Sequence, residues 1–366
     1  MTRIAELRRY ALARSLFAPT TLRRAVERLG FVQADPIRAP ARAQDLILRH
    51  RVHDYRAADL ERHYPRLPVE EEYFVNYGFL VRRHQPLLHP RTARHRKGSV
   101  AQRRMAELLD FAARRGEVHP RAAAEHFAHG RAKNYWGGDS HVTTQLLDHM
   151  HFQGLLRVAR RDNGIRIYAA RAPDGADRPA PQEQARQLLQ LVVQLYAPLP
   201  ASSLTQLTAM LRRSAPQLDR ALAAAAAQAR VSLGQAVVDG VPWYWPADEQ
   251  PRDFAAAPAP VVRLLAPFDP VVWDRRRFEQ FWDWAYRFEA YTPAARRQLG
   301  YYALPLLWRD RVVGWGNLAV DDGALVADLG YVAGSAPADR LFRRELDGEL
   351  HRLAHFLRVD RYQLAR

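Results

Sequence analysis

Gln33 and Asp35 are the two residues whose types and spacing could do chemistry in this chain. They lie in the run Phe31–Ile37, which alternates so that Phe31, Gln33 and Asp35 share one side. On a β-strand, the amide and the carboxylate would project from the same face about two residue rises apart, roughly 7 Å. Such a pair can hold and activate one water molecule. A polar edge strand before a turn would contain the same residues, and this segment alone does not distinguish the two interpretations.

The flanking sequence predicts how this segment is positioned. A helical pattern over residues 20–29 stops at Gly30, and glycine often ends helices. Pro36 follows the carboxylate directly and favours an extended Asp35, because the proline ring clashes with a helical preceding residue. We therefore predict a short strand that begins right after the helix and carries both side chains.

The charge of the chain is concentrated in its first half. The whole chain has 55 Lys+Arg and 39 Asp+Glu, for a net charge of +16. Residues 1–172 hold 32 basic and 17 acidic residues (+15), whereas residues 173–366 hold 23 and 22 (+1). A genome that favours arginine codons would explain the excess of arginine over lysine, but not why the charges balance in one half only. The asymmetry indicates that the first half binds a polyanion such as nucleic acid.

Two clusters of basic residues, together with one isolated lysine, are candidates for contact with DNA phosphates. One cluster follows the predicted strand directly, and the other lies around residues 91–97. The candidates are Arg38, Arg42, Arg49, Arg51, Arg91, Arg94, Arg96, Lys97 and Lys133. Phosphate contacts position a protein on DNA without reading its base sequence. For any single arginine, an exposed solvated charge is an equally good explanation.

Several kinds of site and location are excluded or disfavoured. The chain has no cysteine, which excludes disulfides, thiolate zinc sites and cysteine nucleophiles. His351 and His355 lack the glutamate of the zinc-protease pattern, and no Gly-rich phosphate loop or dinucleotide fingerprint occurs. We therefore predict no metal and no cofactor. The N-terminus lacks a signal-peptide core and no apolar run is long enough for a membrane span, so a cytoplasmic, nucleoid-associated protein is expected.

A helix–helix–hairpin pattern occurs twice. Residues 118–170 contain two helical stretches followed by two strands around the turn signal Asn163-Gly164. Residues 199–246 repeat this order with a turn at Asp239-Gly240. In winged-helix units the second helix commonly enters a DNA groove, and the hairpin forms a wing beside it. A generic helical scaffold would give the same pattern, so the repeat predicts tandem winged helices without proving them.

The predicted fold class is α+β, with three tandem winged-helix domains followed by a β-rich, barrel-like C-terminal domain. The first hundred residues are interpreted as a diverged third copy of the repeat. Composition predicts linkers at residues 171–179 and 253–260. Strands are expected over residues 261–265, 301–308, 311–320 and 324–332, before a closing amphipathic helix over 340–357. The predicted boundaries are 1–100, 101–172 and 181–252 for the winged helices and 260–366 for the last domain.

Several segments together resemble one known family. The run Leu264–Arg275 (LLAPFDPVVWDR) resembles a signature of the AlkZ/YcaQ-like winged-helix DNA glycosylases, and the similarity continues through Phe288–Pro293 and Gly300–Pro305. Gln33-Ala34-Asp35 matches the Gln-x-Asp catalytic motif of this family. One stretch differs, because residues 74–77 read Phe-Val-Asn-Tyr where YcaQ-like members tend to have Trp-Ala-His. This difference indicates a separate subgroup.

The resemblance implies a DNA repair enzyme that excises N-alkylated purines, of the N7-alkylguanine type, from double-stranded DNA. Some members also unhook interstrand crosslinks. In this interpretation Asp35 would stabilise the oxocarbenium charge at C1′ and deprotonate a water, which Gln33 would orient. Lyase chemistry would need an amine, and only Lys97, Lys133 and the α-amino group of Met1 could supply one. We therefore predict a monofunctional glycosylase that hydrolyses the N-glycosidic bond.

A non-catalytic winged-helix regulator is the main alternative. It would explain the repeats and the basic half equally well, but it would not need the Gln33 and Asp35 pair or a large C-terminal domain. Such regulators usually dimerise on palindromic sites. The chain has no heptad pattern or obvious dimer helix, so a monomer is expected. The charge alone also leaves an RNA-binding protein open.

Overall fold

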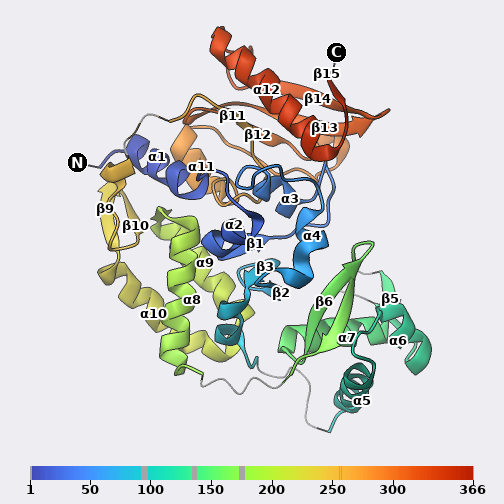
Figure 1. Cartoon of the computed structure of the whole chain (residues 1–366). Helices are drawn as coiled ribbons and strands as arrows, with labels where there is room; N and C mark the ends of the chain where they lie inside the picture. Colours follow the sequence, from blue (N-terminus) through green and yellow to red (C-terminus); the bar gives the residue numbers. More distant parts are fainter. Residues whose placement is uncertain are drawn as a thin grey trace. The chain divides into compact units, whose positions relative to one another are not determined.

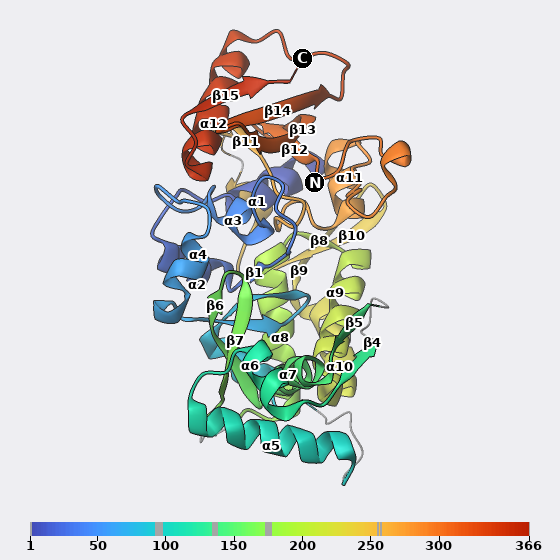
Figure 2. The same cartoon turned by 90° about the vertical axis from the view of Figure 1, so that its right-hand side faces the viewer.

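A computed structural model of the chain describes residues 2–91, 98–133, 138–172, 178–254, 256 and 258–365 (Figures 1 and 2). By its contacts the chain divides into two compact units. The first unit comprises residues 1–60, 189–209 and 224–366, and the second comprises residues 61–188 and 210–223. Residues of the predicted domains 1–100 and 181–252 therefore occur in both units. Part of the predicted linker at 171–179, residues 173–177, lies outside the described residues.

The N-terminal elements of the first unit are short and end at well-defined residues. They are α1 (Ile4–Ser15), α2 (Leu22–Leu29), β1 (Phe31–Gln33) and α3 (Ala43–Leu48), followed by α4 (Asp59–His63) at the boundary between the units. Thr21 caps α2, because its side chain accepts a hydrogen bond from the Arg24 N–H. Gly30 ends the same helix, as its sequence position predicts.

The C-terminal part of the first unit is a five-stranded sheet with helices. Its elements are β11 (Val262–Leu264), α11 (Arg275–Trp282), β12 (Leu304–Trp308), β13 (Arg311–Asp321), β14 (Ala324–Tyr331), α12 (Arg340–Leu357) and β15 (Arg361–Leu364). The strand order follows the sequence, and all neighbours are antiparallel except β14 and β15. Figures 1 and 2 show α12 lying along this sheet. The four predicted strands and the closing helix are confirmed, whereas β15 was not predicted.

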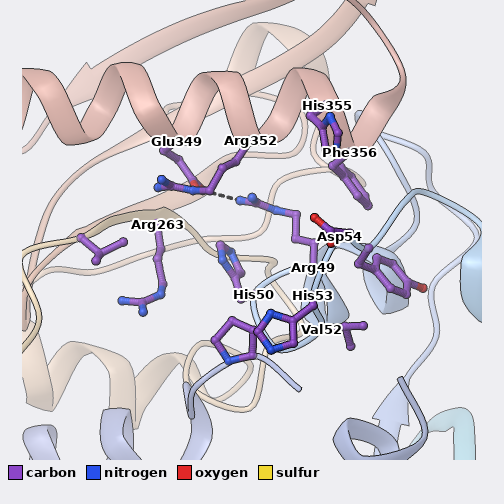
Figure 3. Close-up of a pocket in the computed structure, with 13 residues that line it drawn as sticks. Arg49, His50, Val52, His53, Asp54, Arg263, Glu349, Arg352, His355 and Phe356 are labelled. Atoms are coloured by element: carbon purple, nitrogen blue, oxygen red, sulfur yellow. Dashed lines mark hydrogen bonds and ion pairs between the residues drawn. The ribbon is translucent and has the colours of Figure 1, made fainter. Parts of the chain in front are cut away.

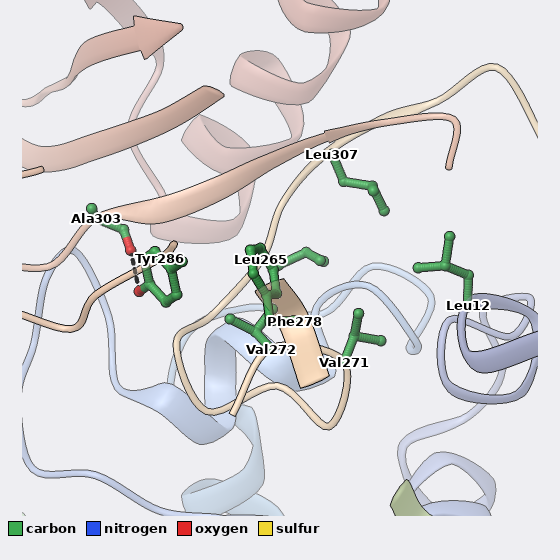
Figure 4. Packing of buried hydrophobic residues seen from close by; sticks show 8 residues of the cluster. All are labelled: Leu12, Leu265, Val271, Val272, Phe278, Tyr286, Ala303 and Leu307. Atoms are coloured by element: carbon green, nitrogen blue, oxygen red, sulfur yellow. Dashed lines mark hydrogen bonds between the residues drawn. The ribbon is translucent and has the colours of Figure 1, made fainter. Parts of the chain in front are cut away.

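A hydrophobic cluster fixes the loop between β11 and α11 (Figure 4). It combines the helix residues Leu12 and Phe278 with Val271 and Val272 from the loop, and all four are almost fully buried. Tyr286 closes the cluster, and its hydroxyl donates to the Ala303 carbonyl oxygen at 2.7 Å. The segment that carried the family resemblance is therefore part of the core of the first unit.

The second unit contains the first predicted helix–helix–hairpin pattern. Its elements are β2 (Val69–Tyr73), β3 (Tyr77–Val81), α5 (Val100–Arg115), α6 (Pro120–Phe127), β4 (Arg131–Lys133), β5 (Asp139–His141), α7 (Val142–Gln153), β6 (Leu156–Asp162) and β7 (Ile165–Ala170). Strands β6 and β7 are antiparallel. Asn163 and Gly164 have φ values of 47° and 85°, which a tight hairpin turn between twisted strands requires. The predicted hairpin is confirmed.

The second pattern has the same order of two helices and a hairpin, and a further helix and a short strand precede it. The preceding elements are α8 (Pro181–Tyr196) and β8 (Leu199–Pro200), and the pattern itself consists of α9 (Ala201–Ser214), α10 (Asp219–Ser232), β9 (Gly234–Val238) and β10 (Val241–Trp245). The turn at Asp239 and Gly240 has φ values of 51° and 75°, so this hairpin is confirmed as well. In both patterns the residue stretch before the first helix pairs with the last strand, through Val118 and Tyr168 in one and Leu199 and Tyr244 in the other. This shared pairing supports an internal repeat.

Short 3-10 helices complete the described elements. They are η1 (Tyr64–Arg66), η2 (Arg82–Leu88), η3 (Pro216–Leu218), η4 (Pro251–Phe254) and η5 (Ala294–Arg296). The described helices include none with both the length and the apolar character needed to cross a bilayer.

Candidate active site

The end of α2 places Gln33 in the interior of the first unit. Gly30 has a φ of 74°, which glycine adopts without strain. A Cβ at this position would lie 2.6 Å from Cδ1 of Leu191, so a larger residue would displace that side chain. Strand β1 begins at the next residue, all three of its residues are buried, and Gln33 is only 8% exposed. The predicted strand directly after the helix is confirmed for Gln33.

Asp35 lies beyond this strand, in a turn. The prediction that Gln33 and Asp35 project from one strand face is wrong, because β1 ends at Gln33. Oδ1 of Asp35 accepts a hydrogen bond from the Ile37 N–H at 2.9 Å, which closes an Asx turn. The Asp35 N–H donates to Oε1 of Gln44 at 3.5 Å, and Gln44 is buried on α3. Pro36 has no N–H to continue a strand, so the aspartate organises a turn instead.

The surroundings of Asp35 disfavour its charged form. Burial raises the pKa of the Asp35 carboxyl above its usual value, and the hydrogen bond from Ile37 opposes this shift only in part. A carboxylate with a raised pKa is a stronger base than a fully solvated one. The half-buried Asp35 is therefore suited to remove a proton from water.

An aromatic cluster from the C-terminal part of the same unit lies within electrostatic range of Asp35. Burial raises the pKa of both Tyr291 and Tyr302, and the negative charge of Asp35 raises them further. The Tyr302 ring meets the Phe288 ring edge-on at 5.3 Å between centroids, and Phe288 contacts Tyr291 and Phe268 at 6.1 and 5.1 Å. Tyr302 is buried and its hydroxyl has no hydrogen-bond partner among the described residues, whereas Tyr291 is 76% exposed.

These aromatic residues were not among the predicted site residues. A signal was available, because Phe288 and Tyr291 lie in one of the family-like segments and Tyr302 lies in another. Both segments lie far from Asp35 along the chain, so the sequence did not show that they are close to Asp35 in the folded structure. An exposed ring beside a carboxylate is able to stack on a nucleobase.

The predicted phosphate contacts differ in their exposure. Arg38 and Lys133 are exposed, and Arg42 is half-buried. Arg94, Arg96 and Lys97 lie outside the described residues. Arg38 and Lys133 therefore stay candidates for contact with DNA.

The predicted contact of Arg49 and Arg51 with DNA phosphates is corrected, because buried carboxylates bind both side chains. The Arg51 guanidinium is fully buried and makes two ion-pair contacts with Asp269, at 2.8 and 3.0 Å. Arg49 has a side chain only 4% exposed and donates to Oε1 of Glu349 at 2.5 Å. These partners follow more than 200 residues later in the chain, so the local sequence showed two unpaired cations where the fold has two ion pairs.

The predicted contact of Arg91 with a DNA phosphate is corrected for the same reason. Its side chain has no exposed surface and donates to Oε1 of Glu72 at 2.9 Å, and it also donates to three backbone carbonyl oxygens. Glu72 belongs to strand β2, where Glu70 and Glu71 are buried as well. Arg171 and Arg161 pair with these two glutamates at 2.6 Å. Buried glutamates of the second unit therefore neutralise part of the positive charge of residues 1–172.

Within the described ranges, no three histidine, aspartate or glutamate side chains gather closely enough to hold a metal ion. The groups of the candidate site are the Asp35 carboxylate, the Gln33 amide and the neighbouring aromatic rings.

Comparison with known proteins relates the chain to a protein family and to a solved structure. The model of a protein family described as DNA glycosylase AlkZ-like matches residues 26–356. The solved structure of the Streptomyces sahachiroi DNA glycosylase AlkZ has a similar fold, with a TM-score of 0.61 and 16% sequence identity over 100% of both chains. The family match includes Gln33, Asp35 and the aromatic cluster.

Proposed function

The chain belongs to the family of AlkZ-like DNA glycosylases, and on this basis we propose that it hydrolyses the N-glycosidic bond of N7-alkylguanine-type purines in double-stranded DNA. Crosslinked purines are included among the proposed substrates. The observation that carries the proposal is the half-buried Asp35, which follows the buried Gln33 by two residues and lies near enough to the exposed Tyr291 to act on it electrostatically.

The proposed reaction needs little help with the leaving group. Alkylation at N7 already makes the purine cationic, so the base departs as a neutral molecule and positive charge develops at C1′ of the sugar. Asp35 stabilises this charge and removes a proton from the attacking water, and Gln33 orients that water through its amide. Tyr291 stacks on the damaged base or on a neighbouring one.

The test of this function is base release from duplex DNA that contains N7-methylguanine. We expect free alkylated base and an abasic site, with strand cleavage only after added heat or alkali. Cleavage by the protein alone would contradict the monofunctional mechanism, and trapping with borohydride would then identify the amine. Absence of base release from any alkylated duplex would contradict the proposed activity.

The pH dependence of this reaction should follow Asp35. Asp35 acts as a base only when it is ionised, so the rate is expected to fall as the pH falls through its pKa. Because burial raises that pKa, the acid limb should lie above the usual aspartate value of about 3.9. A single-turnover pH profile measures this limb. A limb at or below the usual value would show that another group controls the rate.

DNA binding should depend steeply on salt, since phosphate contacts release counterions. Replacing Arg38 or Lys133 by glutamine should reduce the slope of log affinity against log salt by about 1 for each lost contact. Arg340→Gln is the matched control, because Arg340 is an exposed arginine at the start of α12 outside the proposed contacts. Titrations at several salt concentrations measure the slopes. Equal slopes for Arg38→Gln and the control would remove Arg38 from the DNA contacts.

A further inference from the structure

A cavity lined by basic side chains lies in the first unit, and neither Gln33 nor Asp35 lines it (Figure 3). Its volume is about 400 Å³. The lining comes from the segment after α3, from β11 and the residue before it, and from α12. The basic side chains that face it are Arg49, His50, His53, Arg263, Arg352 and His355.

Two of the three arginines share one carboxylate. Oε1 of Glu349 accepts from Arg49 at 2.5 Å, and Oε2 accepts from Arg352 at 3.1 Å. The same carboxylate also accepts a hydrogen bond from the Leu264 N–H at 2.9 Å. Glu349 is fully buried, and these donors already balance its charge. The only other acidic residue of the lining is the exposed Asp54.

His50 contributes a hydrogen bond but no charge at neutral pH. Its Nε2 lies 3.0 Å from the Leu264 carbonyl oxygen, to which it donates. Burial, with the nearby charges of Arg49 and Arg263, holds the pKa of His50 well below its usual value. The charge of the cavity therefore comes from the arginines.

Arg263 is the one arginine of this lining whose side chain makes no hydrogen bond or ion pair with another described residue. It lies on β11, and its guanidinium points away from Glu349 in Figure 3. Burial lowers the pKa of Arg263. The charge of Glu349 raises it again, and the charges of Arg51, Arg352 and Arg49 lower it. A partly buried cation among like charges calls for an anion.

We propose that this cavity binds a phosphate group, with the Arg263 guanidinium as its main ligand and Arg352 and His53 as further donors. A guanidinium presents two parallel N–H donors that match two phosphate oxygens. A space of about 400 Å³ also leaves room for the sugar that carries the phosphate. The phosphate comes either from the DNA backbone or from a free mononucleotide.

Inorganic phosphate tests the site without DNA. We expect phosphate, added at constant ionic strength, to raise the melting temperature of the wild-type protein in a saturable manner. Arg263→Gln should lose this rise, and Arg340→Gln should keep it. Without phosphate, Arg263→Gln should melt at the wild-type temperature or above, because burial and three like-charged neighbours together outweigh the attraction of Glu349 for the lost charge.

Two further measurements distinguish the sources of the phosphate. If the DNA backbone supplies it, Arg263→Gln reduces the salt slope of DNA binding by about 1. If a mononucleotide supplies it, the slope is unchanged, and deoxyguanosine monophosphate stabilises the wild type but not Arg263→Gln. A wild type that phosphate does not stabilise, or equal stabilisation of Arg263→Gln, would overturn the proposal. None of these readouts involves base excision, so they do not depend on the proposed reaction.

Discussion

Asp35→Asn is expected to bind alkylated duplex DNA as the wild type does and to lose most base excision. The asparagine keeps the shape of the side chain and an Oδ1 that can accept from the Ile37 N–H, so the turn should persist. It removes the charge that stabilises C1′ and the base that activates water. Loss of a general base typically lowers the rate by about 10²–10⁴. Single-turnover release of N7-methylguanine measures the rate, and a gel-shift titration measures binding.

Gln33→Ala is the comparison within the same site, and a smaller loss is expected because Gln33 only orients the water. Folding of Asp35→Asn is checked by thermal melting. Burial raises the pKa of Asp35. At pH values above that pKa the side chain is charged, and the buried charge lowers the stability of the folded state. Removing the charge should therefore leave the melting temperature at pH 7 unchanged or raise it. Excision by Asp35→Asn at the wild-type rate would reduce Gln33 and Asp35 to structural residues and would favour the alternative of a non-catalytic regulator.

Asp269→Ala is expected to destabilise the first unit strongly. Asp269 and Arg51 are both fully buried, and the substitution leaves the Arg51 guanidinium without its counter-ion. It also removes the acceptor of the Val271 N–H, which holds the loop after β11. Removing one partner of a buried pair costs about 3–5 kcal/mol. Urea denaturation of the full chain, followed by tryptophan fluorescence, measures the change in the free energy of unfolding.

Two variants test whether the unpaired charge is the cause. Glu125→Ala breaks the exposed pair with Arg121 and should cost only about 0.3–0.5 kcal/mol. Combining Arg51→Met with Asp269→Leu removes both charges, so this double variant should be more stable than Asp269→Ala. If Asp269→Ala lowered the free energy of unfolding no more than Glu125→Ala does, the pair of Arg51 and Asp269 would contribute little to stability.

Local patterns in the sequence predicted the elements well. The hairpins at Asn163-Gly164 and Asp239-Gly240 were predictable because these residues adopt positive φ values with little strain. The closing helix over residues 340–357 was predicted with its bounds, since its apolar spacing is a local signal. Strand β15 was missed, because its pairing with β14 depends on a contact across the whole of α12.

The charged residues were harder to interpret for the same reason. The partners of Arg49, Arg51 and Arg91 come from distant segments, and a single sequence does not show which cations a fold will bury. Gln33 and Asp35 were predicted as site residues from their spacing and the family resemblance, and their roles stay a proposal. The turn at Asp35 and the neighbouring Tyr302 required the structure.

The three buried glutamates of strand β2 have a consequence for how the chain is synthesised. Adjacent residues on a strand point to opposite faces, so Glu71 and its neighbours need cations from both sides. Arg161 and Arg171, which supply part of them, leave the ribosome about 5–20 s after Glu72 at a synthesis rate of about 5–20 residues per second. Until then the hairpin β2–β3 would bury uncompensated carboxylates, so the nascent chain should hold this segment unfolded until the hairpin strands β6 and β7 have been made.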